Sequence, residues 1–102
     1  MEYTTRMLHI IGYWVVIFMR MKIFTNEVLI EEDIDFTRWE TFNGDYVNIA
    51  EVGNTYIERC LDTLELFAER YPNHPNYSIW IRYMNVFEQE LVNRDSNTAL
   101  LV

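Results

Sequence analysis

The clearest pattern along the chain is an alternation of apolar and polar residues on either side of Asn43-Gly44. Asn-Gly tolerates the positive φ angles of a tight turn, so residues 38–49 are predicted to form a β-hairpin. We favour a three-residue loop that starts at Asn43, with a bulge at the turn, because a two-residue loop would mix apolar and polar residues on both faces. This register pairs Phe42 with Tyr46. It also gathers on one face the side chains of Trp39, Thr41, Val47 and Ile49.

Residues 55–71 follow with the spacing of an amphipathic helix, with an apolar residue at every third or fourth position. Thr55 is placed to cap the first turn through its hydroxyl, and Glu58 three residues later completes a capping box. The opposite face is charged, and we interpret it as solvated. The predicted core stripe is Ile57, Leu61, Leu64, Ala68 and Tyr71, with Phe67 beside it.

Pro72 and Pro75 end this helix, because proline cannot continue the hydrogen-bond ladder. A second helix is predicted over residues 76–94, and the short connection makes the two helices an antiparallel αα-hairpin. Residues 95–102 lack helical caps and are predicted to fray as a tail. The apolar stripe of the second helix is Tyr77, Trp80, Ile81, Met84, Phe87 and Leu91.

Upstream of the hairpin, apolar residues fall in two short groups, 23–24 and 28–30, separated by polar residues 25–27. This pattern predicts two short strands joined by a turn. Four carboxylates follow within five residues, without the glycine-containing loop of a calcium site, so we interpret them as a solvated acidic turn. These residues are Glu31, Glu32, Asp33 and Asp35.

Near the N-terminus, residues 7–19 form a run without formal charge that is closed by Arg6 and Arg20. As a helix the run would span about 20 Å, against roughly 30 Å of bilayer hydrocarbon. No small-x-small cleavage site of a signal peptide follows it. Because β-branched and aromatic residues dominate, a buried strand is favoured over a membrane-associated element, which stays open as an alternative. Met19 and Met21 are alternative start positions.

These elements together predict one α+β domain over residues 1–102. Its expected parts are an N-terminal antiparallel β-layer of about four to five strands, followed by the antiparallel αα-hairpin. Residues 1–24 supply a hydrophobic strand or extension, and residues 25–50 supply β-hairpins. A chain of 102 residues suits one modest core without a deep interdomain cleft, so we expect binding through surfaces.

The formal charge of −8 is unevenly placed. Residues 1–24 hold three basic side chains and one acidic one, whereas residues 25–102 hold five arginines and fifteen acids, a net charge of −10. Such an acidic body should repel nucleic acid, so no direct nucleic-acid binding is expected. The single cysteine, Cys60, cannot form an internal disulfide, which suits a reducing cytoplasm.

Candidate chemistry is sparse. The two histidines, His9 and His74, are far apart in sequence and predict no metal site, and His74 is interpreted as a surface turn residue. Cys60 lies beside the predicted helix seam, where a small buried hydrophobe is more usual than a nucleophile. The three glycines are isolated, so no phosphate-binding loop is present. We therefore expect a protein that is not an enzyme and needs no cofactor.

Four strings carry a family resemblance: Trp39-x-Thr41-x-Asn43-Gly44, Val47-x-Ile49-x-Glu51-Val52, Tyr56-Ile57-x-x-Cys60-Leu61-x-x-Leu64-Glu65, and Trp80 with Phe87-x-x-Glu90-Leu91. Over residues 37–94 the chain resembles small proteins encoded by bacteriophages and prophages of Gram-positive bacteria. Asn43 stands where those proteins usually carry Asp, and Tyr56 where they carry His. The resemblance implies a phage accessory protein and assigns no catalytic residue.

The leading functional hypothesis is a phage inhibitor that binds a host anti-phage defence protein directly, with nucleic-acid-binding and nucleotide-signalling proteins as the expected targets. Acidic helical faces can imitate a row of phosphates and block a basic groove. The expected contact residues are acidic and come from the turn and the first helix: Glu31, Glu32, Asp33, Asp35, Glu58, Asp62, Glu65 and Glu69.

The alternative hypothesis is an oligomeric sponge for a nucleotide immune signal, which would stack the base on Trp39 and Tyr46 and hold its charge with Arg59. A membrane-associated protein is the third hypothesis. Self-association into a homo-oligomer is expected in any case, because aromatic residues make up 16% of this small domain.

Overall fold

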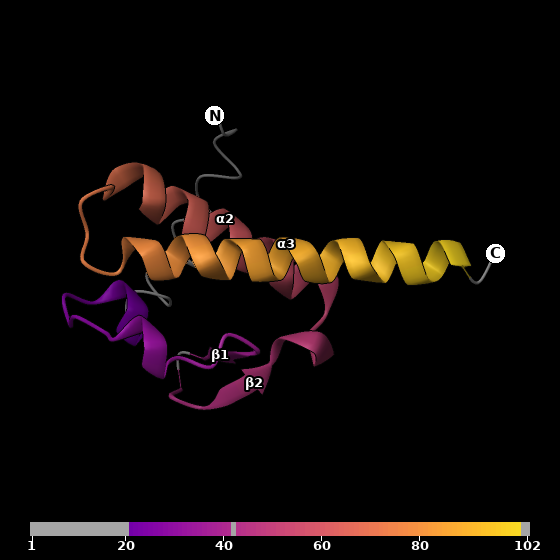
Figure 1. Cartoon of the computed structure of the whole chain (residues 1–102), viewed down its shortest axis with the longest axis horizontal. Coiled ribbons are helices and arrows are strands. Elements are labelled where there is room, and N and C mark those ends of the chain that lie inside the picture. Colours follow the sequence, from indigo (N-terminus) through magenta and orange to yellow (C-terminus); the bar gives the residue numbers. More distant parts are fainter. Residues whose placement is uncertain (1–20, 42, 101–102) are drawn as a thin grey trace.

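Two helices and a two-stranded sheet form the regular structure in the computed structural model, which describes residues 21–41 and 43–100 (Figure 1). Short 3-10 helices occupy Lys22–Phe24, Glu31–Asp33 and Ile49–Glu51. The strands and helices are β1 (Arg38–Glu40), β2 (Tyr46–Asn48), α2 (Asn54–Arg70) and α3 (Tyr77–Leu100). The strand predicted within residues 7–19 lies outside the described residues.

The α+β class is correct, but the predicted β-layer of four to five strands is wrong. Within the described residues, the sheet contains only β1 and β2, which are antiparallel. The two strands predicted between residues 21 and 34 are replaced by two 3-10 helices joined by an extended segment. The physical reason is that side chains of α3 and the loop before it bind the backbone of this segment, where a neighbouring strand would otherwise do so.

The hairpin forms where it was predicted, in a different register. Trp39 pairs with Val47, and the loop lies between Thr41 and Asp45. The Thr41 N–H donates to the Asp45 carbonyl at 2.7 Å. Gly44 donates its N–H to the Thr41 carbonyl and adopts a φ of +87°, which a side chain would disfavour. Glycine is thus the last residue of the turn and not its centre, so the pairing of Phe42 with Tyr46 is wrong. Trp39 and Val47 still share the inward face.

The start of α2 is held by a different group from the one predicted. Its N-cap is Gly53, with no side-chain cap, so the capping box of Thr55 and Glu58 is wrong. Arg94 of α3 instead donates to the Asn54 side-chain oxygen at 2.6 Å and to the Val52 carbonyl at 2.7 Å. One guanidinium therefore joins the end of α3 to the start of α2.

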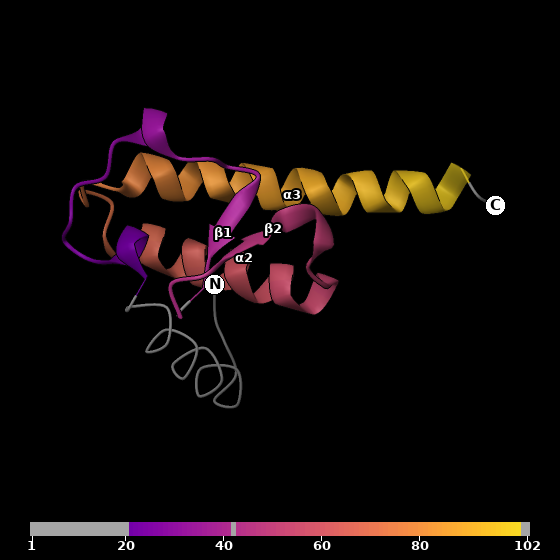
Figure 2. The ribbon, with the colours of Figure 1, turned by 90° about the horizontal axis from the view of Figure 1, so that it is seen from below.

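The core lies between the helix pair and the segments that cross one side of it (Figures 1 and 2). Trp39 of β1 is 1% exposed, and its ring packs edge-on against Tyr83 and Phe87 of α3, with centroids 5.0 and 5.2 Å apart. The Tyr83 hydroxyl donates to the Arg38 carbonyl at 2.8 Å, which fixes β1 on the helix. The other helical core residues are Ile57, Cys60, Leu64, Phe67, Ile79 and Trp80.

α3 continues to Leu100, so the fraying predicted for residues 95–102 is wrong over most of that range. No proline or glycine follows Pro75, and Glu90 pairs with Arg94 one turn later at 3.8 Å. The C-terminal turns of α3 project beyond the rest of the molecule (Figure 1).

Asn76, just before α3, connects the helix pair to the segment that precedes the sheet. Its side chain is fully buried, and its oxygen accepts the Leu29 N–H at 3.1 Å. Its NH₂ group donates to the Glu27 carbonyl at 2.7 Å and to the Ile23 carbonyl at 3.4 Å. Trp80 donates its indole N–H to the same Ile23 carbonyl at 2.7 Å. A buried carboxamide thus supplies the hydrogen bonds that a β-strand would otherwise provide.

We expect Asn76→Ala to lower the free energy of unfolding by about 3 kcal/mol, because it leaves one N–H and one carbonyl unsatisfied in the protein interior. Urea denaturation followed by tryptophan fluorescence would measure the loss. Asn73→Ala is the matched control in the same loop, where the side chain is exposed, and should stay within about 0.5 kcal/mol of the parent. Equal losses for the two variants would contradict this role of Asn76.

Candidate functional site

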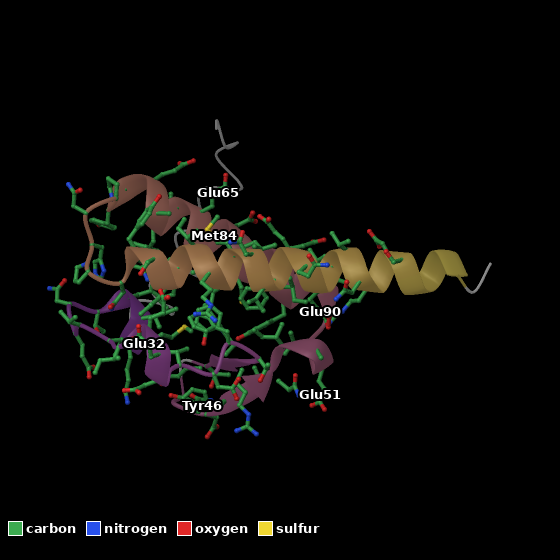
Figure 3. The ribbon with its side chains drawn as sticks, viewed as in Figure 1. Glu32, Tyr46, Glu51, Glu65, Met84 and Glu90 are labelled. Atoms are coloured by element: carbon green, nitrogen blue, oxygen red, sulfur yellow. The ribbon has the colours of Figure 1, made fainter. Side chains whose placement is uncertain are left out.

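The outer side of α2 presents four carboxylates, spaced by four, three and four residues. That spacing aligns them along one face over about 17 Å. The ends of the row are exposed and the middle two members are half-buried. Figure 3 shows Glu65 pointing away from α3. The row is called the α2 acidic face below and consists of Glu58, Asp62, Glu65 and Glu69.

Asp62 is the electrostatically perturbed member of the α2 acidic face. Partial burial raises the pKa of its carboxyl group above the ordinary value, the Glu58 carboxylate raises it further, and Arg59 opposes both effects. The folded protein therefore holds this negative charge at a cost, which a cationic partner would relieve.

The other acidic group predicted to bind a partner surrounds the 3-10 helix Glu31–Asp33, and part of it is already engaged within the chain. Glu31 lies 3.5 Å from the guanidinium of Arg82, which also sits 4.2 Å above the ring of Phe36. Asp35 accepts the hydroxyl of Thr37 at 2.6 Å and its N–H at 3.0 Å, and these bonds lower the pKa of Asp35. Glu32 and Asp33 are exposed.

The structure does not bring the two predicted acidic groups together. Glu32 and Glu65 lie on opposite sides of α3 in Figure 3, and the view from below in Figure 2 likewise separates the 3-10 helix from α2 across α3. A single flat partner cannot cover both. They are therefore two surfaces, of which the α2 acidic face is the more regular.

The three residues predicted for a nucleotide sponge also do not converge. An open groove of about 540 Å³ beside the hairpin is lined by Trp39 and Tyr46, among others, but not by Arg59, which lies on α2. Trp39 is 1% exposed and its ring is packed in the core, so it offers no free face to a base. Tyr46 is 57% exposed, but its hydroxyl donates to Glu40 at 3.0 Å, a bond that raises the pKa of Tyr46.

Cys60 and His74 both occupy structural positions. Burial raises the pKa of the Cys60 thiol, which lies inside the core and is a poor nucleophile in that state. His74 lies in the predicted turn but is half-buried and not at the surface, because its ring stacks on Trp80 at 4.5 Å and its Nδ1 accepts the Asn76 N–H at 3.0 Å. No cluster of three or more metal-ligating side chains is found in the described part of the chain.

Sequence reasoning missed two exposed aliphatic residues, Val28 and Ile30, which are 70% and 61% exposed and line the same groove as Tyr46. The apolar group at residues 28–30 predicted a short strand paired through a turn with residues 23–24. No sequence signal indicates that the strand lacks a neighbour, because that depends on how the chain crosses the helices.

No family model, curated protein or solved structure matches this chain at a significant level. Within residues 21–41 and 43–100, no helix combines the length and apolar character needed to cross a bilayer. The uncharged run at residues 7–19 lies outside the described residues.

We expect Asp62→Asn to stabilise the protein at pH 7, because the raised pKa means that the folded state disfavours the charged carboxylate. The gain should appear as the pH rises above the unfolded-state pKa and should vanish below it, where the aspartate is protonated in both states. Thermal unfolding of both proteins from pH 3 to pH 7 would test this. Glu69→Gln, at the exposed end of the same face, is the control for removing one charge. A stability difference between Asp62→Asn and the parent that stays constant from pH 3 to pH 7 would contradict this role of the Asp62 carboxylate.

Proposed function

We propose that this chain is a non-enzymatic protein that docks its α2 acidic face on a basic surface of another protein. The observation that supports the proposal is the row of four carboxylates along the outer side of one rigid helix. Complementary charge accelerates encounter with a basic partner and disfavours acidic ones. A regular helix also holds these charges in a fixed geometry.

The resemblance to phage accessory proteins suggests which partner this is. The protein acts in the cytoplasm of an infected bacterium and inhibits a host defence protein that works on nucleic acid or nucleotide signals. A row of carboxylates presents successive negative charges, as a nucleic-acid strand does, and competes for the same basic groove. The acidic body of the chain itself repels nucleic acid.

The nucleotide-sponge hypothesis receives less support. Its base-stacking residue Trp39 is buried, and its cation Arg59 lies outside the groove. Self-association stays a prediction, which sedimentation velocity of the full chain would measure.

The decisive experiment is affinity capture from the bacterial host, with mass spectrometry of the proteins and small molecules released on denaturation. We expect a stoichiometric host protein that is lost from a variant with the α2 acidic face neutralised, Glu58→Gln, Asp62→Asn, Glu65→Gln and Glu69→Gln. The expected loss of affinity is at least about tenfold, and it should shrink as salt is added.

The matched control removes four exposed acids from other surfaces, through Asp45→Asn, Glu51→Gln, Glu88→Gln and Asp95→Asn. The control variant has the same net charge as the neutralised variant. It should still capture the partner, and it should still let phage form plaques on bacteria that carry the defence system. Equal loss in both variants would show that bulk charge, and not the α2 acidic face, holds the partner. A released nucleotide without a protein would support the sponge instead.

A further inference from the structure

Residues 27–30 form an extended segment that has the features of an edge strand without a neighbouring strand. The side chains alternate, since Leu29 packs against the core while Val28 and Ile30 are 70% and 61% exposed. Exposed β-branched residues at every second position are typical of one face of a sheet. This segment is called the 27–30 edge below.

The inner side of the 27–30 edge is fully engaged. The Asn76 side chain accepts from the Leu29 N–H and donates to the Glu27 carbonyl. These bonds hold the segment extended against the helix pair. Successive backbone groups of an extended chain point to opposite sides, so the groups of Val28 point outward.

The outward groups have no partner within the described part of the chain. The Val28 N–H and C=O and the Ile30 N–H take part in none of its hydrogen bonds, whereas the Ile30 carbonyl accepts from Asp33. Three free backbone groups beside two exposed aliphatic side chains form a template for one more strand. The adjoining groove of about 540 Å³ gives that strand space.

We propose that the 27–30 edge binds an extended segment of a partner protein by strand addition, and that this segment is β-branched with basic residues at its ends. The charge of the surroundings selects the basic ends. Glu27 in the edge and Glu32 and Asp33 just after it are exposed acids, whereas Glu31 is paired with Arg82 and the adjoining groove also has Lys22 and Arg38 in its lining.

The same charges disfavour a second copy of this chain as the occupant. Antiparallel self-pairing centred on Leu29 would bring Glu27 of one chain toward the 3-10 helix Glu31–Asp33 of the other, where Glu32 and Asp33 are exposed, and like charges brought together across a strand pair are destabilising. A basic segment meets no such penalty. The inference goes beyond the proposed function, because the 27–30 edge lies below α3 in Figure 1 whereas α2 lies above it.

The test uses the full chain and a labelled synthetic peptide, Lys-Arg-Thr-Val-Thr-Ile-Thr-Arg-Lys, followed by fluorescence anisotropy and by amide NMR. We expect saturable binding, with the largest NMR shifts at the Val28 and Ile30 amides. A peptide with N-methyl groups on the central residues cannot complete the backbone bonds, and should bind at least about tenfold more weakly.

Val28→Thr with Ile30→Thr keeps the β-branched shape and the charge but removes the exposed apolar contact, and should weaken binding about tenfold. The control is Val92→Thr, which alters an aliphatic residue on α3 that is 56% exposed. Neutralising the α2 acidic face should leave peptide binding within about twofold, because α2 lies across α3 from the edge in Figure 1 and salt screens charges that are not in contact. That variant therefore separates a failure of this inference from a failure of the proposed function.

Equal binding of the plain and N-methylated peptides would overturn the proposal, as it would indicate charge attraction alone. Protection of the Val28 and Ile30 amides from hydrogen exchange in the free protein would also overturn it. The edge would then already be covered, by residues 7–19 if sedimentation gives a monomer, or by a second copy if it gives a dimer.

Discussion

The structure depends on one buried carboxamide. Asn76 bonds three backbone groups of the preceding segment from a position just before α3, and Trp80 adds a bond to one of the same carbonyls. A buried amide is tolerated only when its donors and acceptors are satisfied, so this contact specifies one geometry of the segment. It also leaves that segment with one bonded side and one free side, which creates the 27–30 edge.

Arg94 plays the corresponding part at the other end of the helix pair. Its guanidinium donates to the carbonyls of Ile49, Ala50 and Val52 and to the Asn54 side chain. This network positions the start of α2, and hence the direction in which the α2 acidic face points. An arginine can do so because its planar fork presents several donors at once.

The distribution of charge follows from this architecture. The two acidic groups that were predicted to bind a partner are separated in space, because α3 lies between Glu32 and Glu65 (Figure 3). In one group Glu31 pairs with Arg82 and Asp35 accepts hydrogen bonds from Thr37, whereas the other group forms a row along a helix. The two proposed binding modes use different surfaces of the chain, one by charge along a helix and one by backbone pairing at an edge.

The sequence by itself determined the α+β class, the hairpin around Gly44, both helices and the burial of Cys60. These features rest on local spacing, turn chemistry and proline positions, which act within a few residues. It did not determine the hairpin register, the end of α3, the roles of His74 and Asn76, or the burial of Trp39. Those depend on contacts between residues far apart in the chain, such as the hydrogen bond between Leu29 and Asn76, which are 47 positions apart. Only the tertiary structure decided whether the backbone of residues 27–30 would pair with a neighbouring strand or hydrogen-bond to the Asn76 side chain.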